Sequence, residues 1–132
     1  MDTARAGLLM AARSLETHSH TVPGGRGYWL TEKIWAAARG LPIIQVAIAD
    51  IAEFDQDCWF GGVAPSLRTV AGHARRIQDA DLAYPIILSA DGRLMDGGHR
   101  IAKAWLAGMS HISAVRFVVD PPPERISPNE TA

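Results

Sequence analysis

A short run of residues, Asp91 to Arg100, combines glycines, a histidine and an arginine where a strand is expected to give way to a helix. Gly97 and Gly98 allow a sharp backbone turn and close approach of a ligand. Free N–H groups in the first turn of the helix favour an anion, and His99 and Arg100 add side-chain donors. The sequence therefore predicts a phosphate-binding site at these four residues. The alternative is a plain strand–turn–helix connection with a surface histidine and arginine.

Carboxylates are the second group of residues that could perform chemistry. Asp50, Glu53, Asp55 and Asp57 lie within eight positions, and such a group could hold Mg²⁺ or supply a general base. We expect Glu53 to be the catalytic base, with Asp50 and Asp55 as alternatives to it. Asp96, directly before the two glycines, is the other candidate catalytic residue, because it could orient a substrate or a metal. The alternatives are a solvated acidic turn and, for Asp96, a helix cap.

A basic helix face is the third feature. The stretch 65–79 is predicted to be a helix that starts at Pro65 or Ser66. Arg68 and Arg75 are seven residues apart and so lie nearly above one another, with Gly72 between them leaving room for a ligand. The alternative is an exposed basic face. The apolar residues of this helix have the spacing of one inward-facing stripe: Leu67, Val70, Ala71, Ala74 and Ile77.

Other reactive residue types give weaker signals. The single cysteine, Cys58, excludes an intramolecular disulfide, and we expect it to be a buried, inert thiol. Trp59 could stack on a base or a substrate, or belong to the core or a lid. His18 and His20 could hold a metal, but no third ligand lies nearby in the sequence, and a polar loop is favoured. No metal site is predicted.

Alternating helices and strands must position these residues, which predicts the α+β class. Asp2 to Leu15 is expected to be a helix and Thr17 to Gly27 a loop. Thr31 is expected to cap a helix that Gly40 ends. The rest of the chain follows the spacing rules: a strand over 43–48, the helix over 65–79, a hairpin of 85–89 and 93–96, a helix from Gly97 to Gly108 that buries Ile101, Ala104 and Trp105, and a strand over 111–119.

Length and composition limit the classes of protein to which this chain can belong. The chain has 132 residues, of which 48% are hydrophobic and 20% charged, as in a folded domain. The net charge of -1 argues against a strongly basic nucleic-acid coat, and no apolar run is long enough to span a bilayer. We expect an extension over 1–30, a domain over 31–120, a flexible tail over 121–132 and a cytoplasmic location.

The order of these segments resembles the ParB/sulfiredoxin superfamily. The resemblance covers about Leu41 to Val119 and is strongest from Pro85 to Gly108, where the glycine-rich segment lies. It implies a compact domain with a small mixed sheet and helices packed on it. It also implies that Gly97, Gly98, His99 and Arg100 bind nucleotide phosphates. The upstream helix would contribute Arg68, and Arg75 or its neighbours.

The chain departs from two groups within this superfamily in ways that argue against their activities. Sulfiredoxins carry a reactive cysteine directly before their His-Arg pair, whereas this chain has Gly98 there, so sulfinic-acid repair is not expected. ParB itself has an arginine-richer motif and continues into a DNA-binding helix-turn-helix, for which no residues are left after Val119. We therefore do not expect a DNA partition clamp.

A stand-alone ParB-like domain is the expected function class. The favoured activity is that of a small Mg²⁺-dependent nucleotide hydrolase or phosphotransferase that uses ATP or CTP. The first alternative is a non-catalytic nucleotide-binding or adaptor module with a small-molecule or protein partner. The second alternative, a nucleic-acid-acting protein, is disfavoured by the near-neutral charge.

Overall fold

The structure is a computed structural model that describes residues 16–128. The helix predicted over Asp2 to Leu15 lies outside the described residues. The described chain divides into two compact units, residues 16–40 together with 120–128, and residues 41–119. The second unit begins after Gly40 and ends at Val119. The predicted α+β class is confirmed, because helices and two small sheets make up the described chain.

The first unit is built on an antiparallel sheet in the order β1-β2-β7. Its strands are β1 (Thr17–Val22), β2 (Gly25–Leu30) and β7 (Arg125–Pro128), and β1 pairs with β2 as a hairpin. The loop predicted over 17–27 is therefore wrong. Strand alternation puts His18 and His20 on one face, where His20 is buried 4.6 Å from the Trp29 ring. Histidines occupy the positions of β1 at which apolar residues would have predicted a strand.

The second helix-forming segment and the C-terminal segment belong to this same unit. Helix α2 (Thr31–Ala38) begins with Thr31 buried as its first residue, so Thr31 is not the predicted N-cap. The segment predicted as a flexible tail is bound to β2. The Trp29 indole donates to Pro121 O at 2.8 Å and the Glu124 N–H donates to Tyr28 O at 2.7 Å.

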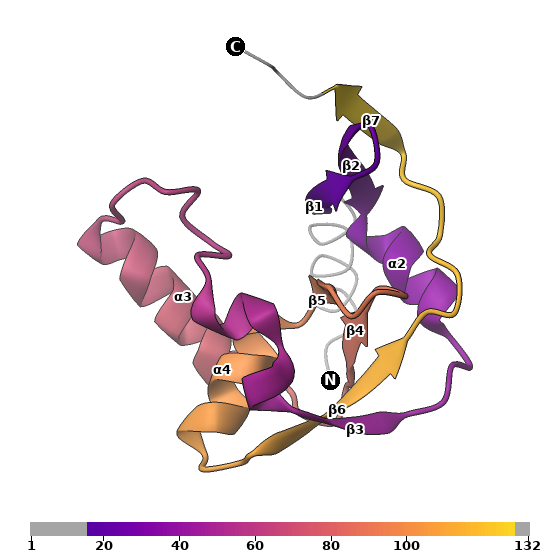
Figure 1. Ribbon diagram of the computed structural model, residues 1–132. Helices are drawn as coiled ribbons and strands as arrows, with labels where there is room; N and C mark the ends of the chain where they lie inside the picture. The colour runs from indigo at the N-terminus through magenta and orange to yellow at the C-terminus, as the bar shows by residue number, and fades with distance from the viewer. Residues whose placement is uncertain (1–15, 129–132) are drawn as a thin grey trace, which may run out of the picture. The chain divides into compact units, whose positions relative to one another are not determined.

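The second unit is a mixed sheet in the order β3-β6-β4-β5, in which β4 and β6 are parallel (Figure 1). Its strands are β3 (Ile44–Ala47), β4 (Ile86–Leu88), β5 (Leu94–Asp96) and β6 (His111–Arg116). The short helices η1 (Ile48–Asp50) and η2 (Ala52–Asp55) follow β3, and the longer helices are α3 (Leu67–Asp79) and α4 (Gly98–Leu106). The predicted 85–96 hairpin is confirmed. The predicted 111–119 strand ends three residues early, at Arg116.

The core of this unit lies between α4, η1 and the sheet. Its buried members are aliphatic: Ile48, Ile51, Ile86, Leu88, Leu94, Ile101, Ala104, Ile112 and Ala114. Ile101 and Ala104 are on the face of α4 that the sequence predicts to be buried. Trp105, predicted on the same face, is instead 56% exposed.

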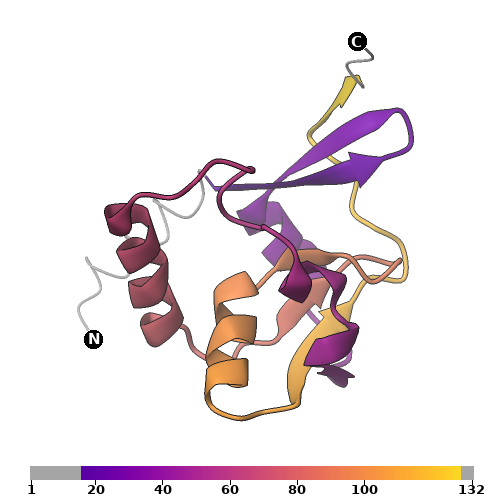
Figure 2. The same cartoon turned by 60° about the vertical axis from the view of Figure 1, so that its left-hand side comes forward.

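Helix α3 departs from the prediction that its apolar stripe packs inward. Leu67 is 86% exposed and Val70 is 47% exposed, and no residue of α3 is fully buried. The helix lies beside α4 in both views (Figures 1 and 2). Thirteen residues extend about 20 Å, whereas the nine of α4 extend about 14 Å. The longer helix therefore runs past its support, and its N-terminal turns carry the exposed apolar side chains.

Gly97 tests how tightly the β5–α4 junction is fixed. Its φ of +120° is strained for other residues, and a Cβ there would lie 2.5 Å from the Ile86 Cγ2 atom. We expect Gly97→Ala to lower the free energy of unfolding by more than about 2 kcal/mol in urea denaturation. The control is Gly72→Ala, where a Cβ meets nothing within 4 Å. This variant should be up to about 1 kcal/mol more stable. Equal effects at the two glycines would contradict this account.

Candidate phosphate site

The site predicted from sequence is centred on the first turn of α4. Gly97 occupies the N-cap position in a left-handed conformation, and no side chain caps the helix. Gly98 and His99 are therefore the first two residues of a helix whose N-terminal N–H groups have no side-chain cap. This confirms the strand–glycine–helix geometry from which the phosphate prediction was made, and it leaves the partial positive charge of the helix end in place.

The surroundings of Arg100 differ from those expected of a phosphate ligand. Its Nη1 atom donates to the carbonyl oxygens of Tyr84 (3.2 Å) and Pro85 (2.7 Å), and its Nη2 atom donates to Asp96 Oδ2 at 2.7 Å. The side chain is only 15% exposed. Arg100 thus clamps the start of β4 and the end of β5 to α4. An exposed, freely available phosphate ligand is not what the structure shows at this position.

The two predicted catalytic carboxylates are also engaged within the fold. Glu53 Oε1 accepts from the Leu94 N–H at 3.2 Å, and Glu53 Oε2 lies 3.5 Å from Arg93 Nε. Its side chain is 12% exposed, so Glu53 ties η2 to the start of β5. Asp96 is paired with Arg100 and makes no side-chain cap to α4. Both carboxylates thus serve as structural acceptors.

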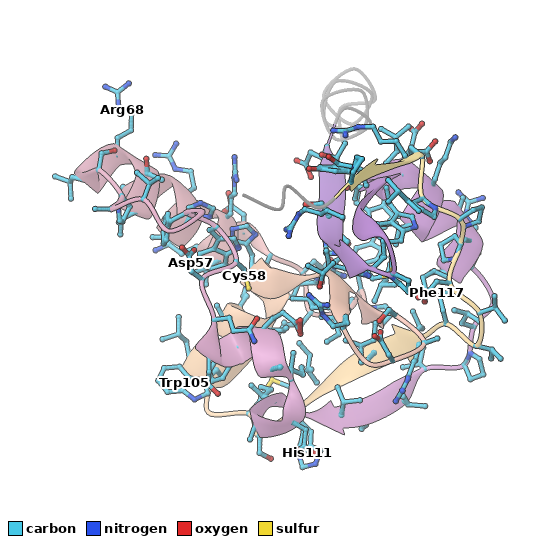
Figure 3. The ribbon with its side chains drawn as sticks, turned by 45° about the horizontal axis from the view of Figure 1, so that its top comes forward. Asp57, Cys58, Arg68, Trp105, His111 and Phe117 are labelled. Atoms are coloured by element: carbon cyan, nitrogen blue, oxygen red, sulfur yellow. The ribbon has the colours of Figure 1, made fainter. Side chains whose placement is uncertain are left out.

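Arg68 and Arg75 are not directed toward α4. His73 of α3 bonds to His99 of α4. At 100° per residue, Arg75 lies about 200° around the helix from His73, and Arg68 about 140°. Arg68 is at the outer end of α3 and points away from Asp57 and Cys58 (Figure 3). The structure therefore does not bring the two predicted arginines together with Gly97 and Gly98.

An aromatic cluster that the sequence did not predict covers the start of α4. The Trp59 indole stacks on His73 and on His99, each at 4.5 Å between ring centroids and within 9° of parallel. The His73 Nδ1 and His99 Nε2 atoms are 2.8 Å apart and share a hydrogen bond. A Cβ at Gly98 would lie 3.3 Å from the Trp59 Nε1 atom. Trp59 therefore rests directly against the first two residues of α4.

The loop that carries Trp59 is fixed by one carboxylate. Asp57 accepts the backbone N–H groups of Trp59 (3.1 Å), Phe60 (2.7 Å) and Gly62 (2.8 Å). The bonds from Gly62 and Phe60, and to a smaller extent that from Trp59, lower the pKa of Asp57. The carboxylate keeps its charge near neutral pH and holds this turn. Within the acidic stretch, Asp57 therefore serves to fix the conformation of the loop that carries Trp59.

Cys58 differs in burial from the prediction but not in reactivity. The residue is exposed, and its Sγ atom donates to Glu53 O at 3.2 Å. Desolvation of the thiol, followed by the negative charges of Glu53 and Asp57, raises its pKa. The thiol therefore stays protonated at neutral pH, which disfavours a role as nucleophile.

His18 and His20 form a pair of their own in the first unit. The His18 Nε2 and His20 Nδ1 atoms are 2.8 Å apart. Within residues 16–128, no group of three or more histidine, cysteine, aspartate or glutamate side chains is placed to hold a metal ion.

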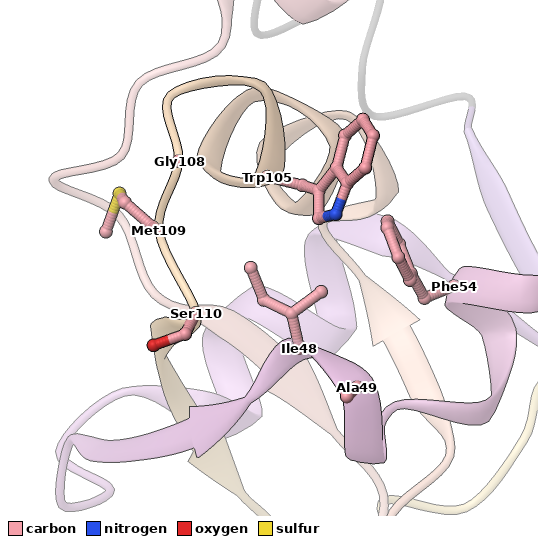
Figure 4. A pocket seen from close by; sticks show the side chains of 7 residues that line it. All are labelled: Ile48, Ala49, Phe54, Trp105, Gly108, Met109 and Ser110. Atoms are coloured by element: carbon pink, nitrogen blue, oxygen red, sulfur yellow. The ribbon is translucent and has the colours of Figure 1, made fainter.

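An apolar groove of about 320 Å³ lies at the other end of α4 (Figure 4). Ile48 and Phe54 face Trp105 across it, and Met109 closes one side. None of the site residues predicted from sequence lines this groove. It is therefore separate from the helix start that the phosphate prediction concerns.

Comparison of the chain with protein-family models, with curated proteins and with solved structures finds no match. Among the helices of the described part of the chain, none is long and apolar enough to cross a membrane.

The clamp role of Arg100 predicts a large effect on stability. We expect Arg100→Ala to lower the free energy of unfolding by about 2 to 4 kcal/mol, because it leaves two carbonyls and Asp96 without their charged donor. Arg68→Ala, at the outer end of α3, should change it by less than about 0.5 kcal/mol. Urea denaturation of both variants measures the difference. If Arg100→Ala were as stable as the unaltered protein, the clamp role would be contradicted, and Arg100 would again be a candidate phosphate ligand.

Proposed function

We propose that the unit formed by residues 41–119 binds the phosphates of a nucleotide at the first turn of α4. The observation that carries this proposal is the uncapped start of α4, which follows a strand through Gly97 at a φ of +120°. A side chain at Gly97 would collide with Ile86, so glycine is what allows this turn. Backbone N–H groups at a helix start bind anions. The resemblance of the segment Pro85 to Gly108 to the ParB/sulfiredoxin superfamily supports the same ligand class.

Aromatic and imidazole groups beside the helix start fit the rest of a nucleotide. Trp59 offers an indole surface adjacent to Gly98, and stacking on such a surface is how many proteins hold a base. His99 and His73 place ring nitrogens at the same point. In this proposal the backbone N–H groups of α4 bind phosphate, His99 adds a donor and Trp59 contacts the base.

A binding module fits the site better than a hydrolase or phosphotransferase that uses Glu53 as its base. Glu53 is held by the Leu94 N–H and by Arg93, and Asp96 is held by Arg100. A general base must reach the proton that it removes, and both carboxylates are already acceptors inside the fold. We therefore propose nucleotide binding as the function of this unit, with ATP and CTP as the first ligands to test.

A charge placed at the first residue of α4 tests the site separately from folding. We expect Gly98→Asp to weaken binding of ATP or CTP about tenfold or more, because its carboxylate repels phosphate at the helix start. The matched control is Leu67→Asp, which places the same charge at the first residue of α3, where the side chain is 86% exposed. Calorimetric titration with ATP, CTP, GTP and ADP, with and without Mg²⁺, measures both variants.

The outcomes of this titration are distinct. Selective binding by the unaltered protein and by Leu67→Asp, with loss in Gly98→Asp, supports the site. Absence of binding for all four nucleotides, or equal binding by Gly98→Asp, contradicts it. A thermal melt of each variant shows whether a loss reflects unfolding, since acidic residues in a first turn stabilise helices.

Turnover is tested at Glu53. We expect Glu53→Gln to bind the nucleotide as the unaltered protein does, because the amide oxygen still accepts the Leu94 N–H. We also expect no phosphate release that depends on Glu53. Release by the unaltered protein that disappears in Glu53→Gln, with binding retained, would replace the binding module by a nucleotide hydrolase.

A further inference from the structure

Two imidazoles from different helices share one hydrogen bond beneath an indole. His73 on α3 and His99 on α4 meet at 2.8 Å between Nδ1 and Nε2, with their rings 13° from parallel. Their centroids are 5.1 Å apart, and each is 4.5 Å from the Trp59 ring. Two rings on opposite faces of an indole would be about twice as far apart, so both imidazoles lie on the same face. Trp59 covers the pair and the start of α4 together.

The hydrogen bond between the imidazoles depends on the number of protons that they carry. With both rings neutral, one nitrogen donates and the other accepts. One added proton leaves this bond in place, because the pair still has one acceptor nitrogen. A second added proton turns both facing nitrogens into donors on two positive rings. The bond is then lost, and the like charges repel one another.

Charged groups on the neighbouring elements act on this pair in different ways. Arg76, on α3, disfavours a positive charge on His73. On α4, Arg100 is paired with Asp96, and Lys103 donates to the Gln78 and Ala80 carbonyls. In the loop, the Asp57 carboxylate is bound by backbone N–H groups, and the raised pKa of Cys58 leaves its thiol neutral. Asp57, Arg100 and Lys103 are engaged in bonds of their own. The imidazole pair is therefore the link between α3 and α4 whose bond depends on added protons near neutral pH.

We propose that Trp59, His73 and His99 form a proton-sensitive latch over the first turn of α4. The latch is closed while the imidazole pair keeps an acceptor nitrogen, and it opens when both rings are protonated. Opening breaks the His73–His99 bond between α3 and α4 and frees the Trp59 indole from Gly98 and His99.

The direction of the pH dependence follows from the protons that each state holds. Desolvation first, and Arg76 second, lower the pKa of His73 in the closed state. The closed state therefore holds fewer protons than the open state. Its stability is fully present above the ordinary histidine pKa of about 6.5 and is lost as the pH falls below that value.

The latch also gives the proposed function a form of regulation, and this step rests on that function. A phosphate bound at the start of α4 brings negative charge beside His99, which favours the second proton on the pair. Binding would then take up a proton and release Trp59 at a higher pH than acid alone does. By linkage, nucleotide affinity should fall as the pH rises from about 6.5 to 8.

Nuclear magnetic resonance of the full chain without nucleotide tests the latch alone. The probes are the ring Cε1–H signals of the histidines and the indole N–H signal of Trp59, followed from about pH 8.5 to 4.5. We expect His73 and His99 to titrate in two coupled steps, and the Trp59 signal to move with the second. A short unstructured peptide that contains one histidine serves as the single-step reference.

Two variants sharpen this titration. In His73→Gln, His99 should titrate in a single step, and the movement of the Trp59 signal should disappear. Trp59→Phe should retain coupled steps, because the imidazole pair remains. Independent single steps for His73 and His99 at the midpoint of the reference peptide would overturn the latch. Movement of Trp59 only below about pH 4, where carboxyls such as Asp57 titrate, would overturn it as well.

Calorimetry at pH values of about 6.5 and 8 tests the regulatory step, with ATP and CTP as probes. The unaltered protein should lose more affinity over this interval than His73→Gln does, since the protonation of the nucleotide is the same for both. Coupled histidine steps without nucleotide binding would keep the latch and contradict the proposed function. Binding with the same pH dependence in both proteins would contradict the regulatory step.

Discussion

The close approach of Gly97 to Ile86 is the constraint on which the second unit depends. The missing Cβ lets the end of β5 turn into α4 directly against the first residue of β4. Arg100, one turn into the helix, fixes the same junction through two carbonyls and Asp96. The junction between the sheet and the helix is therefore both tightly packed and hydrogen-bonded. The position of the α4 helix start, and of every group beside it, follows from this junction.

This constraint explains why Arg100, although it lies beside the segment predicted to bind phosphate, is not free to bind a phosphate group. A guanidinium with three acceptors at 2.7 to 3.2 Å would have to give up those bonds to bind phosphate. The carbonyls of Tyr84 and Pro85 would then lose their charged donor. The backbone N–H groups at the start of α4, by contrast, are not held by a side-chain cap. They are the groups from which an anion site at this helix start can be made.

Local rules predicted much of the second unit. The Asp91-Gly92 turn, the Ser66 cap of α3 and the glycines around α4 fix backbone geometry within a few residues, so the hairpin and both helices were confirmed. Burial depends on what lies opposite in space, and for this reason the exposure of Leu67 and Trp105 was missed. The β1–β2 hairpin was missed because histidines occupy its inward positions.

At the candidate site, too, the sequence predicts local geometry but not contacts between distant segments. Gly97, Gly98 and His99 are contiguous, and the sequence predicts their arrangement correctly. His73 lies 26 residues from His99, and only tertiary packing joins them. One signal was present in the sequence: His73 is three residues after Val70 and four before Ile77, so it continues the apolar stripe of α3. A histidine in such a stripe indicates a polar partner on the facing helix.

The latch and the overhang of α3 have a common mechanical consequence. Lys103 binds the Gln78 and Ala80 carbonyls and so holds the C-terminal end of α3 to α4. The His73–His99 bond holds its middle, and the turns before it extend past α4 with Leu67 and Val70 exposed. Loss of the central bond leaves the Lys103 bonds as a pivot at one end. A change of one proton at the imidazole pair would then be converted into a movement of a helix about 20 Å long, because the end farthest from the pivot has the fewest contacts to oppose it.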